Sequence, residues 1–186
     1  MLKTILKILG GLVAIIVLTA GGFAAYVAGT WPMKRPVHAV DFKVEASPER
    51  LARGKKLVSI RCANCHYDQK TGGLTGRILA DQPKKFGTFF SHNITKDPKL
   101  GAGRYTDGEL AYLLRTGIRR DGLFTGPMML SPHLADEDLA SIIAFLRSDD
   151  PWVAPQAVPP PEPKDKVALG KYLAHRVKSY FMNTAA

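Results

Sequence analysis

The chain has 186 residues, a formal net charge of +10 at pH 7 and only two cysteines. Four of the 26 basic residues precede residue 36 and all 16 acidic residues follow it, so the remainder of the chain carries an excess of +6. That modest excess suits an acidic partner or an anionic membrane surface, and no basic run with interleaved aromatic residues indicates nucleic-acid binding. Without the apolar N-terminus and the Pro-rich tail, about 100 residues remain, which suits one small domain. The core of a domain of this size gives only marginal stability unless a cross-link or a cofactor adds to it.

The first element is an apolar segment. Ile8 to Val27 are 20 residues without a charge, long enough for a helix across the ~30 Å hydrocarbon core. Lys3 and Lys7 precede it and favour a cytoplasmic N-terminus. The alternative is a cleaved signal peptide, but its apolar region is usually about 7–15 residues long, and no clean A-x-A site follows here. We therefore predict a retained, single-pass transmembrane anchor over residues 1–29, followed by an extended tether over 30–46.

The next element is a predicted helix that runs to residue 61. Ser47 followed by Pro48 supplies an N-cap and a proline at the first helical position. Gly54 inside the helix costs about 1 kcal/mol relative to Ala. A close crossing by a second helix, with Phe145 against Gly54, would offset this cost.

The motif Cys62-Ala63-Asn64-Cys65-His66 follows this helix directly. In C-x-x-C-H the two thiols add to the vinyl groups of one porphyrin, and the adjacent His ligates the iron. A thioredoxin-like motif needs a βαβ context, and no strand alternation surrounds Cys62. A zinc site needs further close ligands, and the chain has no third Cys. The motif therefore predicts one covalent haem c, with iron, bound by Cys62, Cys65 and His66 outside the cytoplasm.

Two more helices are predicted after the motif. Thr106 to Glu109 form a capping box, an apolar face follows, and Gly117 ends the helix. Asp136 caps the last helix, whose apolar residues recur at i, i+3, i+4 and i+7: Leu139, Ile142, Ile143 and Leu146. The fold class is therefore all-α, with three or more helices and connecting loops around a flat cofactor.

The sixth iron ligand is expected between these last two helices. Met128 and Met129 lie in a loop punctuated by Gly and Pro rather than on a helix face, and a thioether raises the potential of a His/Met haem. We prefer Met128 and keep Met129 as the alternative. Ligation by a second histidine, His92 or His133, stays open. The haem propionates have three candidate partners: Arg77, Lys84 and Lys85.

Several stretches resemble class I cytochromes c of the alcohol-dehydrogenase cytochrome-subunit type. These stretches are Asn93-Ile94-Thr95, Gly101 to Leu110, Arg119 to Gly122, Gly126-Pro127-Met128 and Asp136 to Leu139. The resemblance covers residues 47–150. It implies a cytochrome c domain there, and a Met-Pro pair as the usual source of the sixth ligand. Here Met129 occupies the Pro position, which leaves the choice between Met128 and Met129 open.

The C-terminal part has a different composition. Residues 151–164 contain six prolines and predict a PPII-like linker. Beyond it, Val167 to Leu173 echoes Leu51 to Leu57, with Ala, Gly, Lys and Leu in the same register. We interpret 165–186 as a basic amphipathic helix and set out the hypothesis that it is the remnant of a second haem module. A chance match within an ordinary amphipathic helix is the alternative.

Together these features predict a membrane-tethered electron-transfer protein that is not itself an enzyme. The resemblance implies that it relays electrons in a respiratory chain, between a quinol-oxidising or dehydrogenase complex and a terminal acceptor. The expected partners are redox proteins in or on the membrane, including an integral-membrane complex reached through the anchor, without nucleic acid or a small-molecule substrate. The expected location is the bacterial inner membrane, with the haem domain on the periplasmic side. A haem with an open coordination site, as in a peroxidase or gas sensor, is the alternative.

Overall fold

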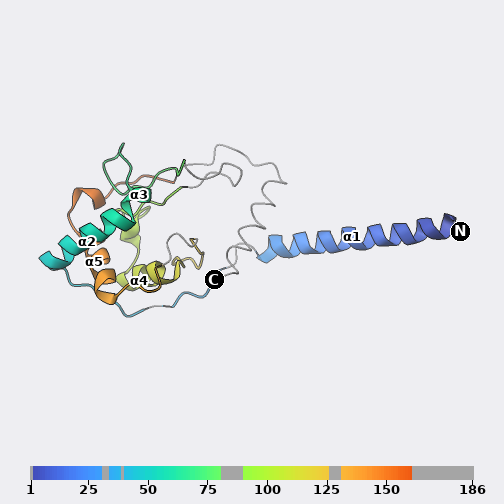
Figure 1. The fold of residues 1–186 in the computed structure, drawn as a ribbon, viewed down its shortest axis with the longest axis horizontal. Helices are drawn as coiled ribbons and strands as arrows, with labels where there is room; N and C mark the ends of the chain where they lie inside the picture. Colours follow the sequence, from blue (N-terminus) through green and yellow to red (C-terminus); the bar gives the residue numbers. More distant parts are fainter. Residues whose placement is uncertain (1, 31–33, 39, 81–89, 126–130, 161–186) are drawn as a thin grey trace. The chain divides into compact units, whose positions relative to one another are not determined.

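The computed structural model describes residues 2–30, 34–38, 40–80, 90–125 and 131–160. The chain divides into two units, residues 1–34 and 35–186, and each is described by itself. Figure 1 shows the elements that form each unit.

The first unit is a single helix, α1 (Leu2–Thr30), 29 residues long. Its part from Leu2 to Tyr26 is long and apolar enough to cross a membrane, and none of that part is buried. A signal sequence near the N-terminus can meet the same criteria of length and composition, so the structure confirms an apolar N-terminal helix and no more. Its retention as a membrane anchor stays a prediction.

The second unit is helical. It contains α2 (Pro48–Arg61), α3 (Ala63–His66), α4 (Asp107–Thr116), α5 (Asp136–Arg147) and two 3₁₀ turns, η2 (Ala102–Arg104) and η4 (Pro151–Val153). Between the described residues of this unit, β pairing is limited to isolated bridges such as Asp68 with Gly73. The all-α prediction is confirmed, and the longest helices, α2, α4 and α5, lie together in Figure 1.

The helix ends follow from local sequence. The Ser47 hydroxyl accepts a hydrogen bond from the Arg50 amide at 3.2 Å, and Thr106 and Glu109 form the predicted capping box. Gly117 ends α4 in the left-handed region, at φ 69°. The prediction that Asp136 caps the last helix is wrong: Asp136 is the first helical residue, and the residue before it makes no side-chain cap. An acid in the first turn still suits the positive end of the helix dipole.

The two long helices α2 and α5 cross at Gly54. A Cβ atom built on Gly54 would lie 2.0 Å from the Ser141 carbonyl oxygen and 2.8 Å from the Phe145 Cβ. No side chain fits in that space, so glycine is required for the two helices to approach so closely. The predicted contact between Gly54 and Phe145 is confirmed.

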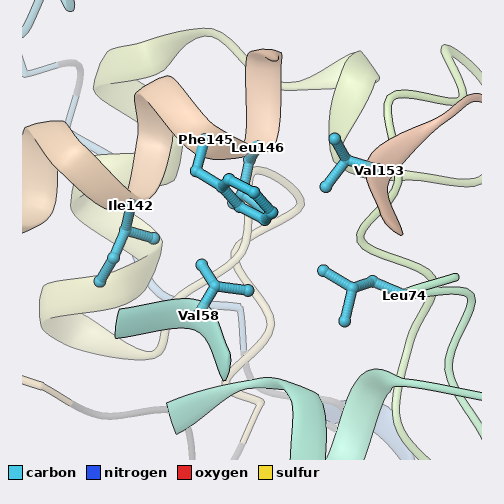
Figure 2. Close-up of a cluster of buried hydrophobic side chains, with 6 residues drawn as sticks. All are labelled: Val58, Leu74, Ile142, Phe145, Leu146 and Val153. Carbon is cyan, nitrogen blue, oxygen red and sulfur yellow. The ribbon is translucent and has the colours of Figure 1, made fainter. Parts of the chain in front are cut away.

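One apolar cluster fills the space beside this crossing. Figure 2 shows its six side chains pointing toward one another from α2, α5, η4 and a loop: Val58, Leu74, Ile142, Phe145, Leu146 and Val153. Val153 is fully buried, although the Pro-rich linker was predicted to begin at residue 151. The carbonyl of its neighbour Trp152 accepts a hydrogen bond from the Leu74 amide at 2.8 Å. The folded core therefore continues past residue 150, and the start of the predicted linker is part of it.

A second cluster lies between α4 and α5. It contains Ala102, Tyr105, Leu110, Ala111, Leu139 and Ile143, and the half-buried Phe42 and Val44 pack against it. These two residues belong to the segment predicted as a tether. After Thr30, the described residues of this segment form no helix or strand before α2, and from Arg35 onward they belong to the folded unit. The predicted helix over 165–186 lies outside the described residues.

Candidate functional site

The two cysteines and His66 lie at the end of α2, on one short turn. The amide of Cys62 still donates to the Val58 carbonyl at 2.9 Å, and α3 then begins. The His66 amide returns to the Cys62 carbonyl at 2.8 Å. Both thiols are free and half-buried. The structure thus brings together the three residues that the motif predicted.

The His66 side chain is buried, with only 5% of its surface exposed. Its Nδ1 lies 2.7 Å from the carbonyl oxygen of His92. Because a carbonyl only accepts, Nδ1 carries the hydrogen and Nε2 keeps its lone pair. Burial lowers the pKa of His66, and the hydrogen bond to His92 opposes this only in part. The residue is therefore a neutral imidazole with one nitrogen held in place, which is the form that binds a metal ion.

The loop segments around Gly76 and Ser91, beside His92, are bound to the Cys-His turn. The Ser91 hydroxyl donates to the Cys65 carbonyl and accepts from the Arg77 amide at 2.9 Å. The Gly76 amide donates to the His66 carbonyl at 2.8 Å. Gly76 has φ 82°, and a Cβ there would lie 2.2 Å from the Ser91 carbonyl oxygen. These bonds fasten the loop to the turn that carries His66.

Sequence reasoning missed Ser91 and Gly76. Ser91 lies 26 residues from Cys65, its partner, and no local pattern announces that pairing. A glycine that needs a positive φ is the one signal available, but Gly76 is one of several glycines in this loop. The Ser91 hydroxyl and the Gly76 amide both bind backbone groups, and side-chain motifs do not reveal such partners.

The environment of Cys62 argues against a redox dithiol. Cys62 packs against the cluster around Val58 and Phe145, and burial raises the pKa of its thiol to about 11. Reactive cysteines instead lower their pKa to expose a thiolate. Across the described part of the chain, no three His, Cys, Asp or Glu side chains gather as a zinc site would need. The donor set of two neighbouring thiols and one neutral imidazole fits covalent haem attachment with axial histidine ligation.

The predicted sixth ligands Met128 and Met129 lie outside the described residues, so their role stays a prediction. The chain on either side of them is bound to α4. The Thr125 amide and hydroxyl both donate to the Gly117 carbonyl, at 2.8 and 2.9 Å. The Ser131 amide donates to the Leu114 carbonyl at 2.9 Å. The loop thus starts and finishes near the C-terminal end of α4.

The two histidine alternatives differ in their surroundings. His92 contacts Nδ1 of His66 through its own carbonyl, so its backbone lies behind that imidazole, away from the free Nε2. The His92 ring meets the Phe90 ring edge-on, with 5.3 Å between the ring centres, and its role as an iron ligand stays a prediction. His133 is exposed near the start of α5.

Of the candidate propionate partners, only Arg77 is described. Its Nη2 donates to the Asn64 carbonyl at 2.6 Å, inside the C-x-x-C-H turn. Arg77 therefore lies beside the attachment motif. Lys84 and Lys85 fall outside the described residues.

Comparison with known proteins adds an independent observation. A family model described as cytochrome c matches residues 51–150, more than half of the chain. The chain is 34% identical over 109 residues to one subunit of the nicotinate dehydrogenase of Pseudomonas putida, a match covering 56% of this chain and 9% of that protein. It is 33% identical over 105 residues to the cytochrome c subunit of alcohol dehydrogenase (quinone) of Gluconobacter oxydans, covering 54% of this chain and 22% of that protein.

A third relative matches over a longer stretch. This is a diheme cytochrome c-type protein of Cereibacter sphaeroides, 29% identical over 141 residues, covering 68% of this chain and 47% of the relative. The matches therefore span from about a tenth to about half of the length of these three relatives.

Proposed function

The chain belongs to the cytochrome c family, and from that premise we propose that it carries a single His/Met haem c in a membrane-tethered electron-transfer domain. Membership of the family implies covalent haem and electron transport, without enzymatic catalysis by this chain. The number of haems, the axial ligands and the tether are the parts we propose.

The observation that carries the proposal is the state of His66. Its Nδ1 hydrogen is held by the His92 carbonyl at 2.7 Å, which leaves Nε2 as the ligating atom. We assign the two thioether bonds to Cys62 and Cys65 and the fifth iron ligand to His66. The haem supplies a reversible one-electron iron couple, while the chain fixes the imidazole and shields it from water.

We assign the sixth ligand to Met128, with Met129 as the alternative. The support is indirect: both ends of the loop that carries them are bound to α4, through Thr125 and Ser131. The residues on both sides of the loop are therefore held in place at the C-terminal end of α4.

We also propose partners and a location. One relative is the cytochrome c subunit of an alcohol dehydrogenase (quinone), which supports a role as the electron-carrying subunit of a dehydrogenase complex. The apolar helix α1 then serves as the single membrane anchor and keeps the haem domain on the periplasmic side of the bacterial inner membrane. Electrons pass between that complex and a terminal acceptor.

The test uses the full chain purified in detergent after expression with a haem-attachment system. We expect covalent haem at one per chain, and in the ferric protein the weak absorption at the red edge of the visible spectrum that marks Met–iron ligation. More than one haem per chain would overturn the single-haem assignment. Fast binding of carbon monoxide to the reduced protein, without that absorption, would favour an open site as in a peroxidase or gas sensor.

A further inference from the structure

Residues 35–38 and 40–44, here called the strap, lie along α4 and the loop after it. At one end, the Val44 amide donates to a carboxylate oxygen of Asp107 at 3.3 Å, at the start of α4. Toward the other end, the Tyr112 hydroxyl donates to the Pro36 carbonyl at 3.2 Å, and the His38 ring meets the Tyr112 ring edge-on at 6.2 Å. The strap therefore touches α4 at more than one turn.

The closest approach between strap and helix is at Gly108. A Cβ atom built there would lie 2.0 Å from the Val40 carbonyl oxygen. That oxygen is backbone and has no flexible end to move aside. The glycine in the first turn of α4 therefore lets the strap lie directly on the helix.

The strap also reaches the loop that follows α4. The Arg35 amide donates to the Gly122 carbonyl at 2.8 Å, and the Arg35 guanidinium lies 6.0 Å from the centre of the Phe124 ring. This loop is a small hairpin, in which the Arg119 amide donates to the Leu123 carbonyl at 2.9 Å. The strap thus holds the tip and the returning side of the hairpin.

The hairpin leads directly into the segment predicted to supply the sixth ligand. Phe124 packs on Gly117, where a Cβ would lie 2.7 Å from the ring. The next residue, Thr125, is bound to the Gly117 carbonyl by two hydrogen bonds. A continuous series of contacts therefore joins the strap, through Phe124 and Gly117, to Thr125, the last described residue before Met128.

We propose that the strap is a positioning element for axial ligation: by holding the Gly117–Thr125 hairpin on α4, it keeps the methionine sulfur on the haem iron. This inference rests on the proposed Met ligation. Without the strap, a larger fraction of the protein has the sixth position open. An added ligand then binds more tightly, because its apparent affinity scales with the open fraction.

Two variants of the full chain test the proposal, each by titration of the ferric protein with imidazole in detergent. Gly108→Ala places a methyl group against the Val40 carbonyl while raising the helix propensity of α4. We expect imidazole affinity to rise about tenfold or more. Tyr112→Phe removes only the hydrogen bond to Pro36, and we expect a rise of about twofold.

The matched control is Ser47→Ala, which removes the N-cap of α2 and leaves every strap contact in place. It lowers the melting temperature, and we expect it to bind imidazole as the parent does. A general loss of stability would raise imidazole affinity in this control as well, and that result would overturn the proposal. Parental imidazole affinity in both Gly108→Ala and Tyr112→Phe would also overturn it. Absence of the Met–iron absorption in the parent would instead overturn the proposed Met ligation, and the strap inference with it.

Discussion

The turn that carries His66 and the hairpin that leads to the predicted sixth ligand are held in different ways. His66 follows a regular helix, and the loop behind it is fastened to the same turn through Ser91 and Gly76. The hairpin from Gly117 to Thr125 is short, and it is held from outside by the strap. His66, the proposed fifth ligand, is thus held by the helical core, whereas the hairpin that leads to the proposed sixth ligand is held by an extended segment from the N-terminal side of the domain.

The apolar side chains beside the Cys-His turn are also more deeply buried than those of the hairpin. Val58, Leu74 and Phe145 beside the Cys-His turn are almost fully buried, whereas Leu123 and Phe124 in the hairpin are only half-buried. Regions with fewer buried apolar contacts open at lower free energy. We therefore expect the His66 side to stay closed under mild denaturation, while the sixth-ligand side opens first.

The largest expected effect comes from the thiols. The double variant Cys62→Ala, Cys65→Ala removes both attachment atoms, so we expect complete loss of haem that survives denaturing electrophoresis. Haem staining of the gel measures this. Lys56→Ala, an exposed change on the same helix, is the control and keeps full staining. Covalent haem remaining in the double variant would contradict attachment at this motif, and it would also contradict the hypothesis that 165–186 is a remnant module that no longer binds haem, since that segment contains no cysteine.

A core truncation compares the two regions directly. Phe145→Ala empties the cluster beside the Cys-His turn, and we expect a loss of about 3–5 kcal/mol in the free energy of unfolding. Leu123→Ala in the hairpin removes a half-buried side chain and should cost about 1 kcal/mol. Urea unfolding of the haem-loaded protein measures both. Equal losses would contradict the difference between the two regions.

Gly54→Ala tests the helix crossing on the His66 side. Alanine favours a helix by about 1 kcal/mol over glycine, yet its Cβ would lie 2.0 Å from the Ser141 carbonyl oxygen. We expect overpacking to prevail and the free energy of unfolding to fall by about 1–3 kcal/mol. Lys56→Ala, on the exposed side of α2, should change it by less than about 0.5 kcal/mol. A stabilising effect of Gly54→Ala would contradict the close approach of α2 and α5 at this residue.

The smallest expected effect concerns the ion pair between α2 and α5. Arg50 donates to both Glu137 carboxylate oxygens, at 2.9 and 3.0 Å, and the Arg50 hydrogen bond lowers the pKa of Glu137. The pair therefore stabilises the folded state above the unfolded pKa of Glu, about 4.3. This contribution is lost as the pH falls through the lower, folded pKa.

Glu137→Gln measures that contribution. We expect a small difference in melting temperature from the parent at pH 6, which shrinks as the pH drops below about 4. Salt at high concentration should also reduce it, because the pair is exposed. A difference that grows toward acid pH would have the opposite sign and would contradict a stabilising ion pair.

The local features of the fold could be predicted from the sequence. The N-cap at Ser47, the capping box at Thr106 and the helix stop at Gly117 each depend on residues a few positions apart. The crossing at Gly54 could also be predicted, because a glycine inside a helix needs a packing reason. The cap at Asp136 could not, because an acid in the first turn and an acid at the cap give nearly the same pattern.

The segments on either side of the domain could not be predicted in the same way. Their prolines indicated an extended chain, but residues 151–153 form a 3₁₀ turn, and composition does not tell whether such a segment packs on a surface. The buried Val153 and the strap contacts depend on backbone groups meeting across more than 50 residues. The role of His92 was missed for the same reason, since its carbonyl, and not its ring, contacts His66.

A mass measurement on the attachment motif decides whether Cys62 and Cys65 hold the haem covalently. Cleavage after Arg61 and Lys70 releases the peptide of residues 62–70, which contains both cysteines. We expect this peptide, from the full chain matured with haem, to carry the mass of one haem, and no other peptide to do so. A peptide 62–70 without haem, recovered from the red, haem-containing protein, would contradict attachment at this motif.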